Sequence, residues 1–217
     1  MVIIQKIKRI LGIIYRNLRF TFAEEVRREL FPPKLPTNKD KKVYIHLGCG
    51  PINASGFINV DIIPYSHVHY IQHIEDLSMF PENYADLIYV SHVLEHVSYN
   101  KISDVLREWY RVLKKTGVLR LSVPDFDKLI EVYFIEEKDI KTIIGPLMGG
   151  QDNFYNFHKS VFNEKYLKEL LLDVGFREVR HWDPKTVELH SFEDWASKPI
   201  QPKKKEYLIS LNIEAVK

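Results

Sequence analysis

Hydrophobic and polar positions follow two different periods, which divide the chain into two parts. In residues 2–30 the apolar positions recur at steps of three and four, the period of one face of an amphipathic helix. The residues of this stripe are Ile3, Ile7, Ile10, Ile14 and Leu18. From Val43 onward, short apolar runs alternate with helical patterns, which is typical of an α/β domain.

Seven segments of the second part have the composition of strands. They are rich in β-branched and aromatic residues and bounded by Gly, Pro or Asp, and they cover residues 43–47, 57–61, 67–71, 85–90, 118–123, 177–183 and 207–217. Helices are predicted for residues 102–115 and 163–176, where apolar residues share one side. Two consecutive strands after such an alternation predict a mostly parallel sheet with an antiparallel edge strand.

Capping residues mark the ends of the two predicted helices. Asn163 is a candidate N-cap of the later helix, and Gly175 follows its last residue. Thr116 and Gly117 are expected to close the earlier helix, with two lysines in its last turn, where the helix dipole favours cations.

Two prolines separate the two parts of the chain. Pro32 and Pro33 end the N-terminal helix, and residues 32–42 are predicted to form a linker. We therefore expect a basic amphipathic helix in residues 1–31 and one α/β domain in residues 43–217, which is long enough for a sizeable core.

The N-terminal segment is strongly basic. Its first twenty residues contain no acidic side chain and five basic ones, which are Lys6, Lys8, Arg9, Arg16 and Arg19. Two interpretations stay open: the helix docks on its own domain or on a second copy in a homodimer, or it lies on an anionic membrane surface. The charges interrupt the apolar stretch too often for a cleaved signal peptide.

Composition narrows the class of protein further. Of the 217 residues, 45% are apolar and 28% charged, and a formal net charge of +2 does not indicate a polyanion-binding protein. The single cysteine, Cys49, excludes an internal disulfide and suits a reducing compartment, so we expect a cytoplasmic protein. No apolar run approaches the roughly 18 residues that span a bilayer.

A glycine turn follows the first predicted strand. Gly48 and Gly50 leave out side chains where the backbone must turn sharply and approach a ligand. Asp61 ends the second predicted strand, where a carboxylate can accept hydrogen bonds from two ribose hydroxyls. Ligands of open α/β sheets bind outside the carboxyl ends of the strands, so the two features together indicate a ribose-containing ligand.

The spacing of these residues disfavours an NAD-dependent dehydrogenase. Only ten residues separate Gly50 from Asp61, whereas a dinucleotide site places its acidic residue about 20 residues beyond the glycines. A full helix and a strand do not fit in that length. The first crossover is therefore expected to be a single turn or a loop.

Four stretches resemble the successive motifs of class I S-adenosylmethionine-dependent methyltransferases: LGCG, FINVDI, IEDLSMFPENYADLIYVSHVLEHV and EWYRVLKKTGVLRLSVPD. The resemblance covers residues 43–217 and is strongest to type-11 methyltransferases of the bacterial group associated with surface-glycan synthesis. It implies a Rossmann-like, mostly parallel sheet of seven strands with an antiparallel edge strand. It also implies S-adenosylmethionine as the cofactor and S-adenosylhomocysteine as its product.

The resemblance implies roles for the first two motifs. Gly48, Cys49 and Gly50 would line the methionine part of the cofactor. Asp61 would bind the ribose hydroxyls, and Ile62 would pack on the adenine. No base is identifiable beside the cysteine in the sequence, so a packing role is expected for it rather than a nucleophilic one.

The third motif would complete the cofactor site. Asp76 and Leu77 would meet the amino edge of the adenine, and Ser91 and His92 would border the methionine and the sulfonium. An alternative for Asp76 is that it caps a turn.

Methyl transfer to a hydroxyl requires a group that removes the proton of the acceptor. An imidazole suits this task because its unperturbed pKa is near neutral, and we expect His158 and His96 to be catalytic. His158 lies in a polar and aromatic loop that is expected to cover the acceptor pocket, with a loop-stabilising role as the alternative. His190, in the 184–206 connection, is a further candidate for this pocket.

The same loop offers groups that could recognise a sugar. Phe154 and Phe157 could stack on one. The polar residues expected to bind the acceptor are Glu95, Gln151, Asn153 and Tyr155.

His92, Glu95 and His96 follow one another in the order of an inverted zinc-protease motif. That motif needs both histidines on one helix, whereas His92 is predicted to end a strand and His96 to begin or precede the next helix. Glu95 and His96 are then an acceptor-side pair or a brace for the following loop. We predict no metal site, since no second ligand set accompanies the other close histidines, His67, His69 and His73.

The sequence thus favours an enzyme that methylates a hydroxyl of a sugar, sugar nucleotide or cell-surface glycan. A lipid or small-metabolite acceptor is one alternative, and a non-catalytic scaffold with the cofactor fold that docks on membrane enzymes is another. A nucleic-acid partner is disfavoured, since dense basic charge occurs only in the N-terminal helix and at residues 203–205. The basic helix fits an acceptor made at the inner face of the cytoplasmic membrane.

Overall fold

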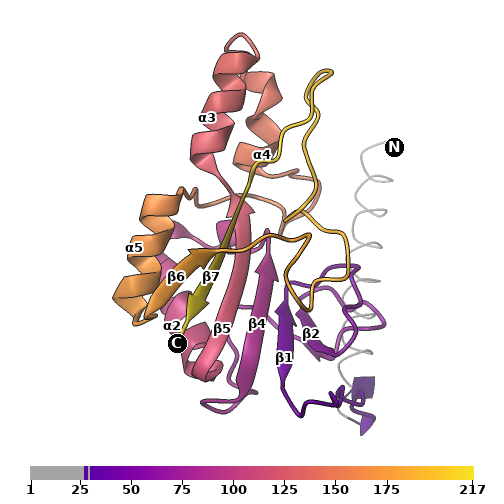
Figure 1. Ribbon diagram of the computed structural model, residues 1–217. Coiled ribbons are helices and arrows are strands. Elements are labelled where there is room, and N and C mark those ends of the chain that lie inside the picture. The colour runs from indigo at the N-terminus through magenta and orange to yellow at the C-terminus, as the bar shows by residue number, and fades with distance from the viewer. Residues whose placement is uncertain (1–26, 29) are drawn as a thin grey trace, which may run out of the picture.

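The computed structural model describes residues 27, 28 and 30–217 (Figure 1). The predicted amphipathic helix of residues 2–30 therefore lies almost wholly outside the described residues. At the end of that segment, the Arg28 guanidinium donates to the carbonyl oxygens of Tyr65, at 3.1 Å, and Val68. The chain just before the linker thus contacts the loop that follows the second strand.

A seven-stranded sheet forms the centre of the domain, in the order β3-β2-β1-β4-β5-β7-β6. The strands are β1 (Tyr44–Leu47), β2 (Phe57–Asp61), β3 (Tyr70–Ile71), β4 (Ala85–Ser91), β5 (Leu113–Pro124), β6 (Glu178–His181) and β7 (Ser210–Val216). β7 pairs antiparallel with β5 and β6, whereas the pairs from β3 to β5 are parallel. The predicted fold class is confirmed, and the antiparallel strand lies one place in from the edge of the sheet.

Within residues 31–217, helices occur only after β4. They are α2 (Ile102–Val112), α3 (Phe126–Ile135), α4 (Ile144–Met148), α5 (Glu164–Val174) and the single 3-10 turns η1 (Leu94–His96), η2 (Tyr99–Lys101) and η3 (Ile140–Thr142). The caps predicted for α5 are confirmed. Asn163 accepts a hydrogen bond from the Tyr166 N–H at 3.0 Å, and Gly175 has a left-handed φ of 118°.

The predicted end of α2 is wrong. The helix ends at Val112, and Leu113 already pairs with Ala85 as part of β5. The two lysines therefore lie beyond the helix, where Lys114 forms an ion pair with Asp86 at 2.6 Å. Pairing with the neighbouring strand, which the helical period does not report, decides this boundary.

One face of the sheet is covered by α2 and α5, as Figure 1 shows. Alternate residues of β1 and β4, among them Ile45, Leu47 and Ile88, point into this core together with Trp109 and Leu167. All five side chains are fully buried. The core explains why the apolar sides of the two helices could be recognised in the sequence.

The opposite face is covered by the long connection between β6 and β7. Tyr44, Phe57 and Tyr89 point to this side and pack with Trp182 and Phe192. The connection takes the place of helices, because residues 48–56 between β1 and β2 form only turns. The expected short first crossover is confirmed.

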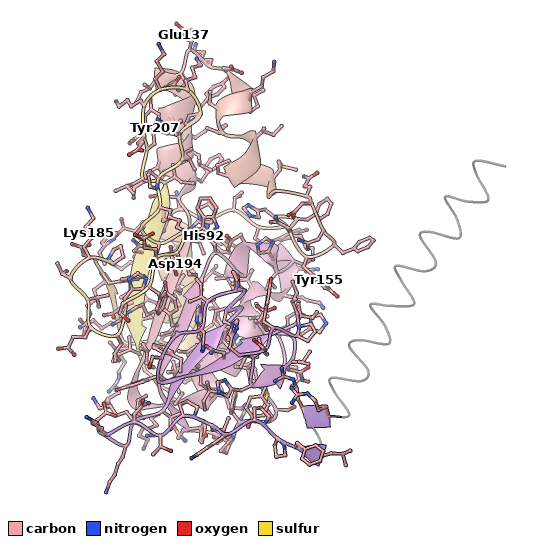
Figure 2. The ribbon with its side chains drawn as sticks, turned by 90° about the vertical axis from the view of Figure 1, so that its right-hand side faces the viewer. His92, Glu137, Tyr155, Lys185, Asp194 and Tyr207 are labelled. Atoms are coloured by element: carbon pink, nitrogen blue, oxygen red, sulfur yellow. The ribbon has the colours of Figure 1, made fainter. Side chains whose placement is uncertain are left out.

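A small lobe rises above the carboxyl ends of β4 and β5. It contains α3, α4 and residues 200–209, which share a cluster of Leu129, Val132, Ile143 and Ile209. Glu137 and Tyr207 mark this lobe above His92 in Figure 2. The lobe provides a wall on the side of the sheet where ligands of such folds bind.

Candidate functional site

The glycine turn after β1 packs closely against the segment after β4. Gly48 has a φ of +62°, and a Cβ there would stand 2.4 Å from Cγ2 of Val93. Gly50 has a φ of +53°, but nothing lies within 4 Å of the place its Cβ would take. Gly48 therefore makes room for the Val93 side chain, and Gly50 leaves open space beside the turn.

Asp61 lies beside this turn, as the sequence predicted. Its Oδ2 accepts a hydrogen bond from the Gly50 N–H, and its Oδ1 accepts one from the Ile63 N–H, both at 2.7 Å. Burial of the side chain, which is 7% exposed, raises the pKa of its carboxyl group. Each oxygen keeps a second lone pair for a hydroxyl of a bound ribose.

Two residues that were not predicted as cofactor residues also lie against the glycine turn. The His67 Nε2 is 3.0 Å from the Gly50 carbonyl oxygen and 3.8 Å from the Cys49 Sγ. The His67 ring stacks on Tyr65 with centroids 5.7 Å apart. Burial raises the pKa of the Cys49 thiol, so the uncharged sulfur packs in the turn.

Asp76 and Leu77, the residues predicted at the adenine edge, form hydrogen bonds within the protein. Asp76 is exposed, and its Oδ1 accepts a hydrogen bond from the Ser78 N–H at 2.9 Å. The Leu77 side chain is buried in the core, and its N–H donates to the Glu108 Oε1 at 3.1 Å. The turn-capping alternative describes the geometry of Asp76.

The end of β4 holds a strained histidine. His92 has a φ of +52°, in the left-handed region that β-carbon atoms disfavour. Its Nε2 is 2.8 Å from the Ser210 Oγ, and the buried Ser91 Oγ before it has no hydrogen-bond partner. The left-handed backbone of His92 turns the chain so that the two side chains point in different directions. His92 points into a cavity, and Val93 packs onto Gly48.

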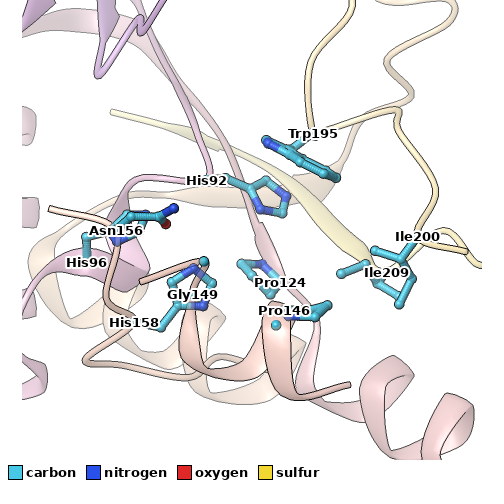
Figure 3. Close-up of a pocket in the computed structure, with 12 residues that line it drawn as sticks. His92, His96, Pro124, Pro146, Gly149, Asn156, His158, Trp195, Ile200 and Ile209 are labelled. Atoms are coloured by element: carbon cyan, nitrogen blue, oxygen red, sulfur yellow. The ribbon is translucent and has the colours of Figure 1, made fainter. Parts of the chain in front are cut away.

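A cavity of about 350 Å³ lies at the carboxyl ends of β4 and β5 (Figure 3). Its walls come from the segment after β4, the end of β5, α4 with the following loop, and the β6–β7 connection. The lining residues are His92, His96, Pro124, Gly145, Pro146, Gly149, Gly150, Asn156, His158, Trp195, Ile200 and Ile209. Three histidines thus meet at one cavity: His92 and His96 from the segment after β4, and His158 from a distant loop.

A buried carboxylate lies behind these histidines. Glu95 is 1% exposed, and neither of its carboxyl oxygens has a hydrogen-bond partner. Its Oε1 is 3.4 Å from the His92 Nδ1 and 3.9 Å from the His158 Nε2. The His96 and His158 rings meet edge to face, with centroids 4.9 Å apart.

Backbone hydrogen bonds hold the loop of His158 against η1. The Glu95 carbonyl oxygen accepts hydrogen bonds from the N–H groups of Lys159, at 2.8 Å, and Ser160, at 3.1 Å. The Ser160 hydroxyl donates to the Val97 carbonyl oxygen at 2.6 Å. These bonds place His158 beside Glu95 although 62 positions separate them in the chain.

Burial shifts the protonation of this cluster. It raises the pKa of Glu95 to about 8, and it lowers the pKa of His92 to about 3 and that of His158 to about 4. Burial also lowers the pKa of His96. The histidines are therefore neutral near pH 7 and can accept a proton or donate a lone pair.

The other predicted acceptor residues lie elsewhere. Gln151, Asn153 and Tyr155 are exposed and do not line the cavity, and Figure 2 shows Tyr155 at the surface. Their roles stay predictions. His190 lies on the opposite face of the sheet, where its ring contacts Phe192 at a centroid distance of 4.7 Å.

Among the polar and aromatic residues of the cavity, sequence reasoning missed Asn156 and Trp195. Asn156 belongs to the predicted loop, for which the sequence indicates Asn153 and Tyr155 as the polar ligands. Trp195 lies in the β6–β7 connection, where no periodic pattern indicates which face of the sheet the chain will cross. The His92 and Trp195 ring centroids are 6.1 Å apart.

Glu95→Gln is expected to flatten the pH dependence of stability. The folded protein keeps the Glu95 proton up to a pKa of about 8, whereas the unfolded chain releases it near 4.5. The unfolded state binds fewer protons in this window, so stability falls as pH rises. The cavity histidines, whose folded pKa values are lowered, oppose this trend only below their ordinary pKa of 6.5.

The effect of Glu95 on stability is therefore measured between pH 6.5 and 8, where the histidines do not oppose it. Thermal unfolding in chelator-containing buffer should show a falling Tm for the wild type and a flatter curve for Glu95→Gln. Glu75→Gln, which removes an exposed carboxylate, is the control and should follow the wild type. Identical slopes for wild type and Glu95→Gln would contradict the raised pKa.

Comparison with known proteins agrees with this geometry. Residues 58–121 match a family model described as a methyltransferase domain. The ubiquinone/menaquinone biosynthesis C-methyltransferase UbiE of Vibrio vulnificus is 28% identical over 146 residues, which are 64% of this chain and 53% of that protein. The chain spans about half the length of the curated relatives it matches.

Solved structures share the fold. A SAM-dependent methyltransferase from Archaeoglobus fulgidus superposes with a TM-score of 0.52 at 17% identity, covering 90% of this chain and 93% of that one. The 1,6-didemethyltoxoflavin-N1-methyltransferase of Burkholderia thailandensis, which holds S-adenosylhomocysteine, has a TM-score of 0.50 at 16% identity and covers 90% and 76%. The chain therefore has the fold of S-adenosylmethionine-dependent methyltransferases, and the matched domain and this fold support S-adenosylmethionine as its cofactor.

Proposed function

We propose that this protein is an S-adenosylmethionine-dependent methyltransferase that methylates a hydroxyl oxygen of an acceptor bound in the cavity. The observation that carries the proposal is the position of residues 91–93 between two sites. Val93 packs on the glycine turn, and the preceding residue, His92, lines the cavity. An acceptor in the cavity and a ligand on the glycine turn would therefore meet across this short segment.

The residues at the turn fit the cofactor. Gly50 leaves free space where a side chain would stand, and Asp61 keeps lone pairs at the end of β2. The buried, unpartnered Ser91 hydroxyl at the end of β4 can donate a further hydrogen bond. When bound, the cofactor supplies an electrophilic methyl group on a sulfonium sulfur.

The cavity histidines support removal of a proton from the acceptor. His158 is neutral near pH 7 because burial lowers its pKa to about 4, so its ring can accept a proton. The Glu95 Oε1, 3.9 Å from the His158 Nε2, would accept a hydrogen bond from the resulting imidazolium. His96 contacts the same ring and serves as the second candidate.

A sugar hydroxyl is the acceptor we favour. Trp195 lines the cavity and leaves 53% of its surface exposed, which suits stacking on a sugar ring. Asn156 lines the same cavity and offers both a donor and an acceptor. A sugar, sugar nucleotide or surface glycan would present hydroxyls to the histidines from this side.

A lipid or small metabolite with an apolar ring is the second candidate. Pro124, Pro146, Ile200 and Ile209 give the cavity apolar walls. The similar UbiE protein is named for ubiquinone and menaquinone biosynthesis. Such an acceptor would bind by burial of its ring rather than by hydrogen bonds.

The cofactor site can be tested without knowing the acceptor. Asp61→Asn should weaken S-adenosylhomocysteine binding at least about 10-fold, because a buried carboxylate that accepts hydroxyl hydrogen bonds is lost. Asp76→Asn should change it less than about 3-fold, since Asp76 is exposed and caps a turn. Isothermal titration calorimetry measures both. No binding by the wild type would favour the scaffold alternative.

His158→Ala should lower kcat by about 10²- to 10⁴-fold, the usual contribution of a general base, and leave S-adenosylhomocysteine affinity unchanged. Turnover would be followed by S-adenosylhomocysteine release over panels of nucleotide sugars and of catechols. His73→Ala, at an exposed position outside the cavity, is the matched control. Full turnover in His158→Ala would remove this residue as the base.

A position at the cytoplasmic membrane is supported by the sequence of residues 2–30. Among the described residues, no helix is long and apolar enough to cross a membrane. The full chain should therefore float with liposomes that contain anionic lipid but not with neutral ones. The full-length triple variant Lys6→Glu, Lys8→Glu and Arg9→Glu should lose this difference, whereas equal flotation of both proteins would end the membrane proposal.

A further inference from the structure

We propose that Glu95, His96 and His158 bind a divalent transition-metal cation whose open coordination positions face the acceptor cavity. Each residue offers a ligand atom, and these atoms lie within 4.8 Å of one another. Neither the order of these residues in the sequence nor the expected helix geometry predicts this meeting, because His158 comes from a distant loop.

The distances suit a site that closes slightly around an ion. The Glu95 Oε1 and the His158 Nε2 are 3.9 Å apart. Ligand bonds of roughly 2.0–2.2 Å place neighbouring donor atoms about 3–3.5 Å apart around one ion. The Glu95–His158 pair reaches that spacing by closing less than about 1 Å, and a pair at the 4.8 Å limit of the cluster would close by about 1.3–1.8 Å, which side-chain rotation can supply.

The environment of Glu95 most strongly indicates a bound cation. Glu95 is 1% exposed with both carboxyl oxygens unpartnered, and no lysine or arginine of the described chain forms an ion pair with it. The titratable groups that face it are the imidazoles of His92 and His158, with His96 beside them. An ionised Glu95 without a partner would be costly, and a cation held by the neighbouring neutral imidazoles removes that cost.

The histidines are oriented as metal ligands usually are. The His96 Nδ1 lies 3.1 Å from the Phe157 carbonyl oxygen, so an N–H there leaves Nε2 with a free lone pair. The His158 backbone N–H donates to the Met148 carbonyl oxygen at 3.0 Å, which holds the loop that carries the second ring. The bond of His96 fixes its tautomer and ring plane before an ion arrives.

The donor set indicates the kind of ion. Two imidazoles and one carboxylate suit Zn²⁺, Mn²⁺, Fe²⁺ or Co²⁺, whereas Mg²⁺ and Ca²⁺ prefer oxygen ligands. Three protein ligands leave positions for water or substrate. Since His96 and His158 both line the cavity, these positions open toward the acceptor.

The consequence for chemistry rests on the proposed function. A hydroxyl oxygen of the acceptor that coordinates the ion has a lowered pKa, and its proton leaves to water in the cavity. The remaining alkoxide is the nucleophile. With the ion bound, His96 and His158 act as ligands rather than as proton acceptors, while His92 stays bonded to Ser210.

The test is direct titration of the chelator-treated full chain with Zn²⁺, Mn²⁺ and Mg²⁺, by calorimetry and by metal analysis after dialysis. We expect one Zn²⁺ or Mn²⁺ per chain and much weaker Mg²⁺ binding. Co²⁺ should give visible absorption bands that acceptor analogues change. Glu95→Gln and His158→Asn should each lower the affinity at least about 100-fold, more than the loss of a group that only orients a metal ligand does.

A matched control is available at the surface. Glu164→Gln removes a carboxylate whose Oε1 is 3.0 Å from the His181 Nε2, with both side chains more than half exposed, and should leave binding unchanged. Circular dichroism and S-adenosylhomocysteine affinity report folding of every variant. Glu95→Gln should not unfold the protein, because neither carboxyl oxygen of Glu95 has a hydrogen-bond partner that the substitution would remove.

The proposal is overturned if the wild type binds no ion saturably, if Glu95→Gln and His158→Asn bind like the wild type, or if Glu164→Gln loses as much affinity. Full methyl transfer in excess chelator would overturn only the catalytic role of the ion and not its binding. A chain that binds the ion but not S-adenosylhomocysteine would overturn the proposed methyltransferase function and leave the metal site standing.

Discussion

The contact between Val93 and Gly48 is the constraint on which the two sites depend. A side chain on Gly48 would stand 2.4 Å from Val93, so the glycine turn and the segment after β4 fit together only without it. The left-handed His92 makes this contact compatible with a histidine that points into the cavity. One strained residue thus joins the glycine turn to the cavity.

The short crossover between β1 and β2 affects how the sheet is covered. Without a helix between β1 and β2, one face of the sheet is left to the β6–β7 connection, whose Phe192 packs on Phe57 and Tyr89. The same connection brings Trp195 to the cavity. Covering the sheet and lining the cavity are therefore tasks of one segment, and its sequence must satisfy both.

The polar cluster at the cavity differs from the rest of the interior. Buried charged side chains elsewhere have ion-pair or hydrogen-bond partners, as Arg120 has in Glu214 at 2.7 Å and Asp61 has in two backbone N–H groups. Glu95 has no hydrogen-bond partner among the described residues and faces only imidazoles. This contrast supports the cation proposed at Glu95.

The sequence by itself determined the sheet, the short first crossover and the pairing of the glycine turn with Asp61, because periodicity, capping and the ends of strands are local properties. It also indicated His92, Glu95 and His96 as one motif and His158 as a separate candidate. Only the tertiary structure decided that they meet, since the hydrogen bonds from Lys159 and Ser160 to Glu95 join distant segments. It likewise placed Asp76 in an exposed turn and Trp195 at the cavity, because the course of an irregular connection depends on which face of the sheet needs cover.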